Sequence, residues 1–178
     1  MNHVEELIDA LALCLPQLDP EPLLADAPAD ANQLGVLRWM SRHLQQQNLL
    51  AYEEWTEYFG EIPDLRPLSG IDFSTYDSTF IPALLQGVDW EEADAELAYT
   101  LPYELPYLEH INGLLRSHEL RLVDLLPFEN AYILCVTDDA KKIDRLSQCL
   151  QQFEMGINRR DGLDPSQVET YVKELLGS

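Results

Sequence analysis

The sequence has few glycines and few cysteines, and each scarcity argues against a class of chemistry. Only 8 of the 178 residues are glycine, and no phosphate-binding glycine loop, nucleophile elbow, paired CxxC or HExxH motif occurs. The three cysteines, Cys14, Cys135 and Cys149, lie far apart among apolar neighbours, which favours buried thiols over a disulfide framework. We therefore expect no metal, no cofactor and no thiol catalysis.

Long apolar runs are also missing. No uncharged apolar stretch reaches the roughly 18 residues that a membrane-spanning helix needs. The residues from Met1 to Glu6 include no Lys or Arg of the kind that opens a signal peptide. We expect an intracellular, cytoplasmic protein, and 178 residues with 46% hydrophobic content are enough for one packed domain, residues 1–178.

Basic residues are scarce, with 11 Lys and Arg against 32 Asp and Glu, so the formal net charge is −21. Such a field repels nucleic-acid backbones and anionic membranes. We therefore expect neither as a direct partner, and a basic protein is the expected partner. Residues 51–113 hold 14 of the acids against the single basic residue Arg66, together with 11 of the 16 aromatic residues. Function is best sought in this acidic, aromatic segment.

Hydrophobic periodicity predicts an α+β fold with a largely helical part over about residues 1–118 and a β-hairpin, helix and strand over about 119–178. In the first part we expect an N-terminal helical hairpin over residues 3–15 and 30–47, the second helix with Leu34, Leu37, Met40 and Leu44 inward. A further helix should run from Pro106 to about residue 117. In the second part we expect an antiparallel hairpin over 120–125 and 131–136, a helix containing Ile143 to Phe153, a third strand over 155–158, and a helix starting at Asp164.

Short helices are expected within the acidic, aromatic segment, over residues 52–60, 80–87 and 89–99. The first would place acids four residues apart on one face and aromatic side chains on another: Glu53, Glu57 and Glu61 against Tyr52, Trp55 and Phe59. The last would begin with a capping box of Asp89 and Glu92.

These features lead to the hypothesis of a non-catalytic, acidic protein-binding protein, such as a bacterial inhibitor or immunity-type protein that neutralises a basic toxin or nuclease domain. Its acids would attract a Lys/Arg-rich surface and its aromatic residues would anchor it. The acids expected to do so are Glu53, Glu54, Glu57, Glu61, Asp89, Glu91, Glu92, Asp94 and Glu96, and the expected anchors are Trp55 and Trp90.

Three alternatives remain open from the sequence. The acidic segment can be a solvated face with every tryptophan in the core. The chain can be a small carboxylate-dependent hydrolase or transferase, with a cleft near Glu109, His110 and His118. It can also be an adaptor or oligomerising module, which would expose an apolar patch.

Overall fold

An antiparallel four-stranded sheet forms the centre of the molecule. The computed structural model describes residues 2–177, and its strands are β1 (Leu50–Tyr52), β2 (Leu120–Leu126), β3 (Tyr132–Thr137) and β4 (Gly156–Asn158). Their order across the sheet is β1-β3-β2-β4, and every neighbouring pair is antiparallel. The α+β class, the β2–β3 hairpin and the third strand next to it are confirmed.

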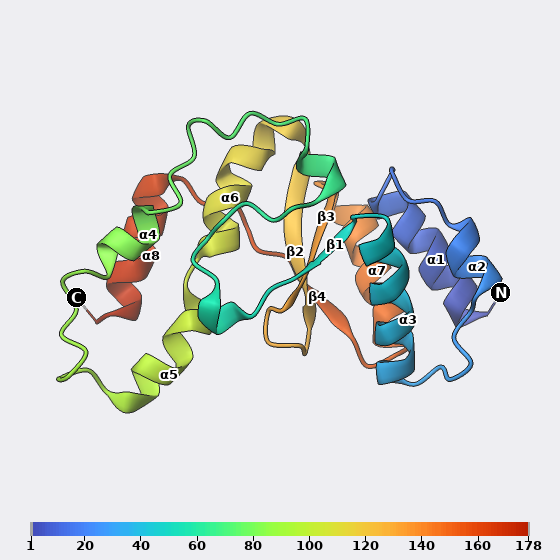
Figure 1. Cartoon of the computed structure of the whole chain (residues 1–178), viewed down its shortest axis with the longest axis horizontal. Coiled ribbons are helices and arrows are strands. Elements are labelled where there is room, and N and C mark those ends of the chain that lie inside the picture. Colours follow the sequence, from blue (N-terminus) through green and yellow to red (C-terminus); the bar gives the residue numbers. More distant parts are fainter. Residues whose placement is uncertain (1, 178) are drawn as a thin grey trace.

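Helices cover both faces of this sheet (Figure 1). On one side lie α1 (His3–Cys14), α2 (Glu21–Ala25), α3 (Gln33–Gln46) and α7 (Ala140–Gln151). On the other lie α6 (Tyr107–Leu115) and, farther out, α4 (Phe80–Leu84), α5 (Ala95–Glu104) and α8 (Pro165–Leu175). Short 3-10 turns are η1 (Trp55–Glu57), η2 (Arg66–Leu68) and η3 (Arg116–His118). The two ends of the chain lie at opposite ends of the long axis (Figure 1).

The two faces of the sheet belong to two separate hydrophobic cores, because successive side chains of a strand point to opposite faces. Val123 and Leu125 of β2 pack with α1, α3 and α7, whereas Leu122 packs with the core around α6. In the same alternation, Asp124 falls on the α6 side and is fully buried. A fully buried carboxylate therefore lies inside the core on the α6 side.

Local signals fix several helix ends as expected. Asp164 and Gln167 form a reciprocal capping box with Pro165 at the first helical position of α8. The buried stripe of Ile143, Leu146 and Leu150 runs along α7. Three predicted helices are confirmed: the one over 3–15, the one from Pro106 to about 117, and the one that starts at Asp164. Each predicted end lies within one or two residues of the observed end.

The helix predicted over residues 52–60 is wrong. Leu50 to Tyr52 instead form β1, paired in register with Leu134 to Tyr132 of β3, and only the single turn η1 follows. Gly60, with φ +87°, turns the chain where a Cβ would meet the Tyr107 ring at 2.7 Å. Strand pairing thus overrides the helical spacing, and the predicted acidic and aromatic faces of one helix do not exist.

The helix predicted over 89–99 is also wrong in its position. The helix α5 begins at Ala95, and Asp94 caps it by accepting a hydrogen bond from the Glu96 amide. The Asp89 side chain accepts from the Glu91 amide within a turn, not in the predicted capping box. Asp89, Glu91 and Glu92 therefore lie between α4 and α5, outside any helix, so a helix dipole does not explain them.

Two smaller differences concern the first half of the chain. Leu34, predicted to face inward, is 54% exposed near the start of α3. The strand β1 comes from the part that was predicted to be helical. Among residues 2–177, no helix combines the length and the apolar character needed to cross a membrane.

Candidate functional site

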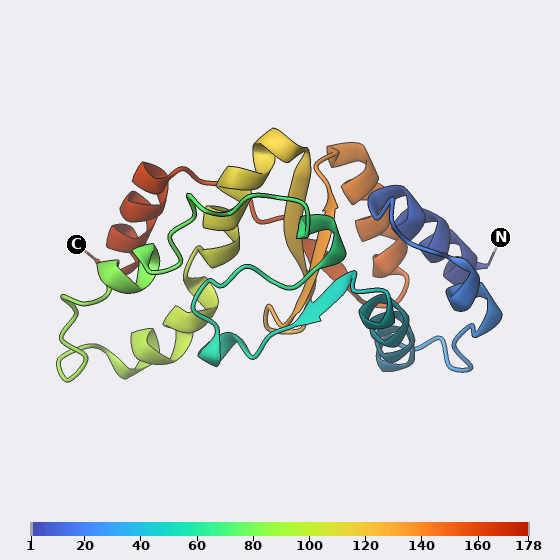
Figure 2. The same ribbon diagram turned by 45° about the horizontal axis from the view of Figure 1, so that its top comes forward.

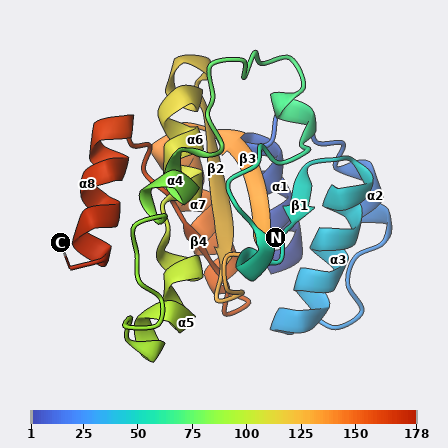
Figure 3. The ribbon, with the colours of Figure 1, turned by 60° about the vertical axis from the view of Figure 1, so that its left-hand side comes forward.

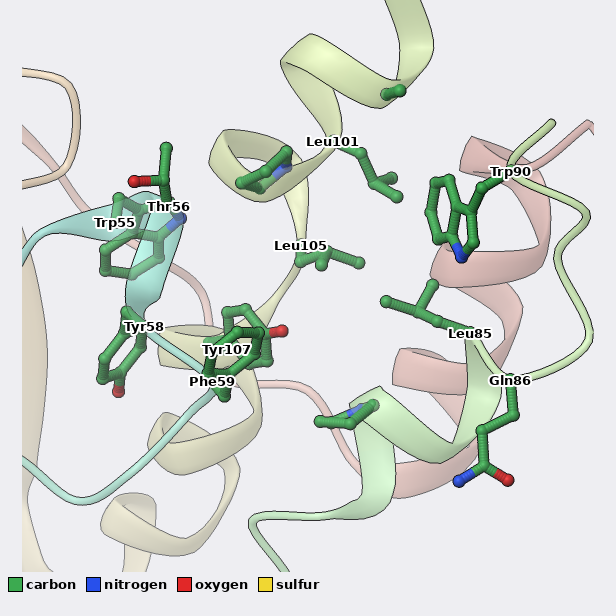
Figure 4. Close-up of a pocket in the computed structure, with 13 residues that line it drawn as sticks. Trp55, Thr56, Tyr58, Phe59, Leu85, Gln86, Trp90, Leu101, Leu105 and Tyr107 are labelled. Atoms are coloured by element: carbon green, nitrogen blue, oxygen red, sulfur yellow. The ribbon is translucent and has the colours of Figure 1, made fainter. Parts of the chain in front are cut away.

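The acidic, aromatic segment folds around an apolar cavity of 410 Å³, here called the tryptophan cleft. Its wall includes Trp55, Phe59, Leu85, Trp90, Leu101 and Tyr107. Figure 4 shows Trp55 and Tyr58 on one side, Trp90 and Leu85 on the opposite side, and Leu101 and Leu105 between them. The two tryptophans singled out from the sequence, 35 residues apart in the chain, thus face the same cavity.

Different elements bring these side chains together. Trp55 comes from η1, Leu101 from α5 and Tyr107 from the start of α6, while Trp90 lies in the turn region between α4 and α5. Figures 2 and 3 show α4 and α5 on the opposite side of the molecule from α3. The cleft is therefore a product of tertiary packing, not of one amphipathic helix.

The two tryptophans differ in their role in this wall. Trp55 is only 2% exposed and stacks on Tyr58 with ring centroids 4.7 Å apart. Trp90 is 46% exposed. Trp55 is therefore a fixed part of the wall, and Trp90 is the tryptophan that an incoming molecule can reach directly.

The predicted acids flank this cleft along the chain. Eight of the nine are exposed and Glu53 is half-buried. Glu54 and Glu57 lie close to Trp55, and Asp89 and Glu91 are the neighbours of Trp90. Within residues 2–177 none of the nine forms a salt bridge. Their charge is therefore not neutralised by a basic side chain of the described chain.

A second cavity of 330 Å³, here called the carboxylate pocket, shares the lining residue Trp55 with the tryptophan cleft. Three carboxylates line it, Glu53, Glu54 and Glu129, together with the rings of Tyr52, Trp55, Tyr103, Phe128 and Tyr132. The Tyr52 hydroxyl donates to Glu54 at 2.8 Å. This bond and the nearby Glu54 charge raise the pKa of Tyr52. Burial, and then the charge of Glu61, raises the pKa of Glu53.

The β2–β3 turn sets the position of Glu129. Glu129 and Asn130 both have left-handed backbone angles, with φ 52° and 64°. The Asn130 side chain donates to the Tyr103 carbonyl oxygen at 2.9 Å. The hairpin turn is thereby tied to α5, which holds two walls of the carboxylate pocket in place.

Trp55 also contacts a buried ionic cluster formed by Arg160, Asp124 and Glu109. The guanidinium of Arg160 lies 5.7 Å from the centre of the Trp55 ring, donates to Asp124 at 2.6 Å and donates to Glu109 at 3.1 Å. Burial raises the pKa of both carboxyls, although Arg160 opposes the shift. The cluster packs against Trp55, the residue that lines both cavities.

No protein family, curated protein or solved structure matches this chain. The chemistry of the two cavities and the charge around them are therefore the observations that bear on function.

The residues of the predicted enzymatic cleft do not converge. Glu109 bonds to Arg160, and His118 is exposed in η3. His110 lines a separate cavity of 220 Å³, between the rings of Tyr76 and Phe80. Burial lowers the His110 pKa, and neither ring nitrogen has a hydrogen-bond partner within residues 2–177. In that same range, no three His, Cys, Asp or Glu side chains are grouped as metal ligands would be.

Several site residues were not found from the sequence. Glu129, Phe128 and Tyr132 belong to the hairpin, outside the acidic segment, and only the antiparallel pairing of β3 with β1 brings them to Tyr52. Arg160 was also missed. One signal for it was present, because Asp124 lies among Leu122, Val123 and Leu125 of a predicted strand. A carboxylate buried among such residues needs a charged or hydrogen-bonding partner.

Proposed function

We propose that this chain is a non-catalytic binding protein whose partner is a Lys/Arg-rich protein, and that it acts as an inhibitor or immunity-type protein of a basic toxin or nuclease domain. The observation that carries the proposal is the tryptophan cleft, an apolar cavity with the exposed Trp90 in its wall. It lies within a segment that has 14 acids and one basic residue. Apolar contact area and opposite charge thus occur at one place.

The two parts of this surface would contribute differently to binding. Charge complementarity raises the rate of encounter and weakens as salt is added, with a Debye length of about 10 Å at 0.1 M. A few buried residues, often Trp, Tyr or Arg, carry most of the binding energy in protein interfaces. A surface that served only solubility would have no need for a tryptophan that is 46% exposed beside an apolar cavity.

Affinity capture with charge-matched variants tests this proposal. The immobilised chain is exposed at low salt to a lysate of the organism from which the sequence comes, and bound proteins are eluted with a salt gradient. One variant neutralises four acids beside the cleft tryptophans, Glu54→Gln, Glu57→Gln, Glu91→Gln and Glu92→Gln. A control neutralises four exposed acids elsewhere in the chain, Asp9→Asn, Glu21→Gln, Glu154→Gln and Glu174→Gln.

The two variants have the same net charge, so they separate a local site from a general acidic field. We expect the unchanged chain and the control to retain one basic protein in stoichiometric amount, and the cleft variant to lose it. Equal retention by both variants, or no stoichiometric basic protein at all, contradicts the proposal.

A further inference from the structure

Trp55 lines both the tryptophan cleft and the carboxylate pocket, so one residue belongs to the walls of two cavities of different chemistry. Cavities that share a lining residue are neighbours, and an extended peptide advances about 3.3 Å per residue, so a few residues of peptide reach from one cavity to the other. A single extended segment can therefore occupy both.

The carboxylate pocket has the chemistry that recognises a guanidinium. Its carboxylates can accept paired hydrogen bonds from an arginine, and its rings offer faces for cation–π contact. Tyr132 makes edge contacts with both Tyr52 and Phe128, with centroid distances of 5.1 and 5.6 Å. No salt bridge within residues 2–177 involves Glu53, Glu54 or Glu129.

Trp55 adds a separate indication of an occupant. Its side chain is almost fully buried, yet its indole N–H has no acceptor in the described chain. Figure 4 shows the indole nitrogen on the ring edge toward Thr56, another residue of the cleft wall. A buried donor without an acceptor is unfavourable, and a peptide carbonyl can satisfy this one when the side chains that cover the indole nitrogen move aside on binding.

We propose that the tryptophan cleft and the carboxylate pocket form one bipartite site for an extended segment of the basic partner. An apolar side chain enters the cleft and an arginine about three residues away enters the pocket, while a backbone carbonyl between them accepts from Trp55 once the side chains over the indole nitrogen have moved. This inference rests on the proposed function. A second copy of this chain is a poor occupant, because two chains of charge −21 repel each other.

Short synthetic peptides test the bipartite site without knowledge of the partner. The probe is acetyl-Gly-Leu-Ser-Ser-Arg-Gly-amide, made also with the order of Leu and Arg reversed. Two controls replace arginine by citrulline, which keeps the shape without the charge, or leucine by serine. Binding is followed through the indole N–H signals of the three tryptophans in the ¹⁵N-labelled full chain, with Trp39 of α3 as the internal reference.

We expect Trp55 and Trp90 signals to move and Trp39 to stay. In at least one order, the complete probe should bind about tenfold or more tighter than either control, because the second contact is made within the bound peptide. Equal affinity for the arginine and citrulline peptides, shifts at Trp39 only, or no shift at millimolar peptide overturns the bipartite site.

Matched variants localise the arginine. Glu129→Gln removes a pocket carboxylate, while Glu119→Gln removes an exposed glutamate at the other end of β2 with the same left-handed backbone, φ 55° against 52°. Glu129→Gln should weaken the arginine peptide several-fold and leave the citrulline peptide unchanged, and Glu119→Gln should change neither. If both variants weaken binding equally, only the overall negative charge of the chain attracts the peptide. The carboxylate pocket is then not the arginine site.

The outcome is distinguishable from failure of the proposed function. If the capture yields a basic protein that depends on the cleft acids but the peptides show no bipartite pattern, this inference falls and the proposed function stands. If the peptides bind as expected but no basic protein is captured, the paired cavities stand and the proposed function falls.

Discussion

Replacement of Arg160 by methionine should be among the most damaging single changes in the molecule. Arg160 is the only basic residue bonded to Asp124 and Glu109 within residues 2–177, and Asp124 is 0% exposed. Removing one partner of a buried ion pair typically costs about 3–5 kcal/mol, because the other charge stays buried without compensation. Loss of the Trp55 contact adds about 0.5–2 kcal/mol.

The expected loss of unfolding free energy in Arg160→Met depends on pH, and the ionisation of the buried carboxyls determines in which direction. Burial raises the folded-state pKa of Asp124, so the folded state binds more protons than the unfolded state above the ordinary value of 3.8. Stability therefore falls as pH rises from there through the folded pKa. Without Arg160 this pKa rises further, so the variant loses more stability at pH 7 than near pH 4.

Urea unfolding followed by circular dichroism at pH 7 and pH 4 measures both quantities. Arg121→Met is the matched control, because Arg121 lies on β2 and bonds to the exposed Asp138 and Asp161. We expect that control to lose about 1 kcal/mol or less. A loss of under 1 kcal/mol for Arg160→Met at pH 7, or a loss that does not shrink at pH 4, refutes the reasoning.

Further predictions concern single groups. Glu109→Gln should gain stability relative to the unchanged chain as pH rises above 4.5, since burial raises the Glu109 pKa and the glutamine cannot ionise; a flat difference between the two unfolding curves across pH speaks against this. Caesium ions should quench tryptophan fluorescence more than iodide ions do, because acids surround the exposed Trp90. Trp90→Phe should remove this difference between the two quenchers. A difference that persists in the variant means that it does not come from Trp90. Burial raises the pKa of Cys14 to about 11 and of Cys135 to about 12. We therefore expect an aromatic disulfide reagent to label only Cys149 in the folded protein at pH 8. If the folded Cys149→Ser variant is labelled at the same rate as the unchanged chain, this prediction is wrong.

Local signals were enough to predict much of the fold. The stripe along α7, the cap and proline at the start of α8, and the two apolar runs around the 127–130 turn each specify their element within a few residues. Such elements carry their own start, stop and periodicity. Their prediction therefore did not depend on knowing the packing.

Elements that depend on distant partners could not be predicted in this way. The spacing of Tyr52, Trp55 and Phe59 suits a helix, but Leu50 to Tyr52 pair with strand residues 80 to 84 positions away in the chain. The same limit applies to the site. Trp55 and Trp90 stood out as residues, whereas their meeting in one cleft, and the arrival of Glu129 beside Glu54, are results of tertiary structure.

The association rate constant of the chain with its captured basic partner, measured by stopped flow at 50 mM and 300 mM salt, tests the central claim most directly. We expect the rate to fall steeply with salt for the unchanged chain and for the control with four distant acids neutralised. The variant with the four cleft acids neutralised should start slower and depend less on salt. Equal rates for the two variants, or a rate that salt does not change, would contradict an acidic cleft built to receive a basic partner.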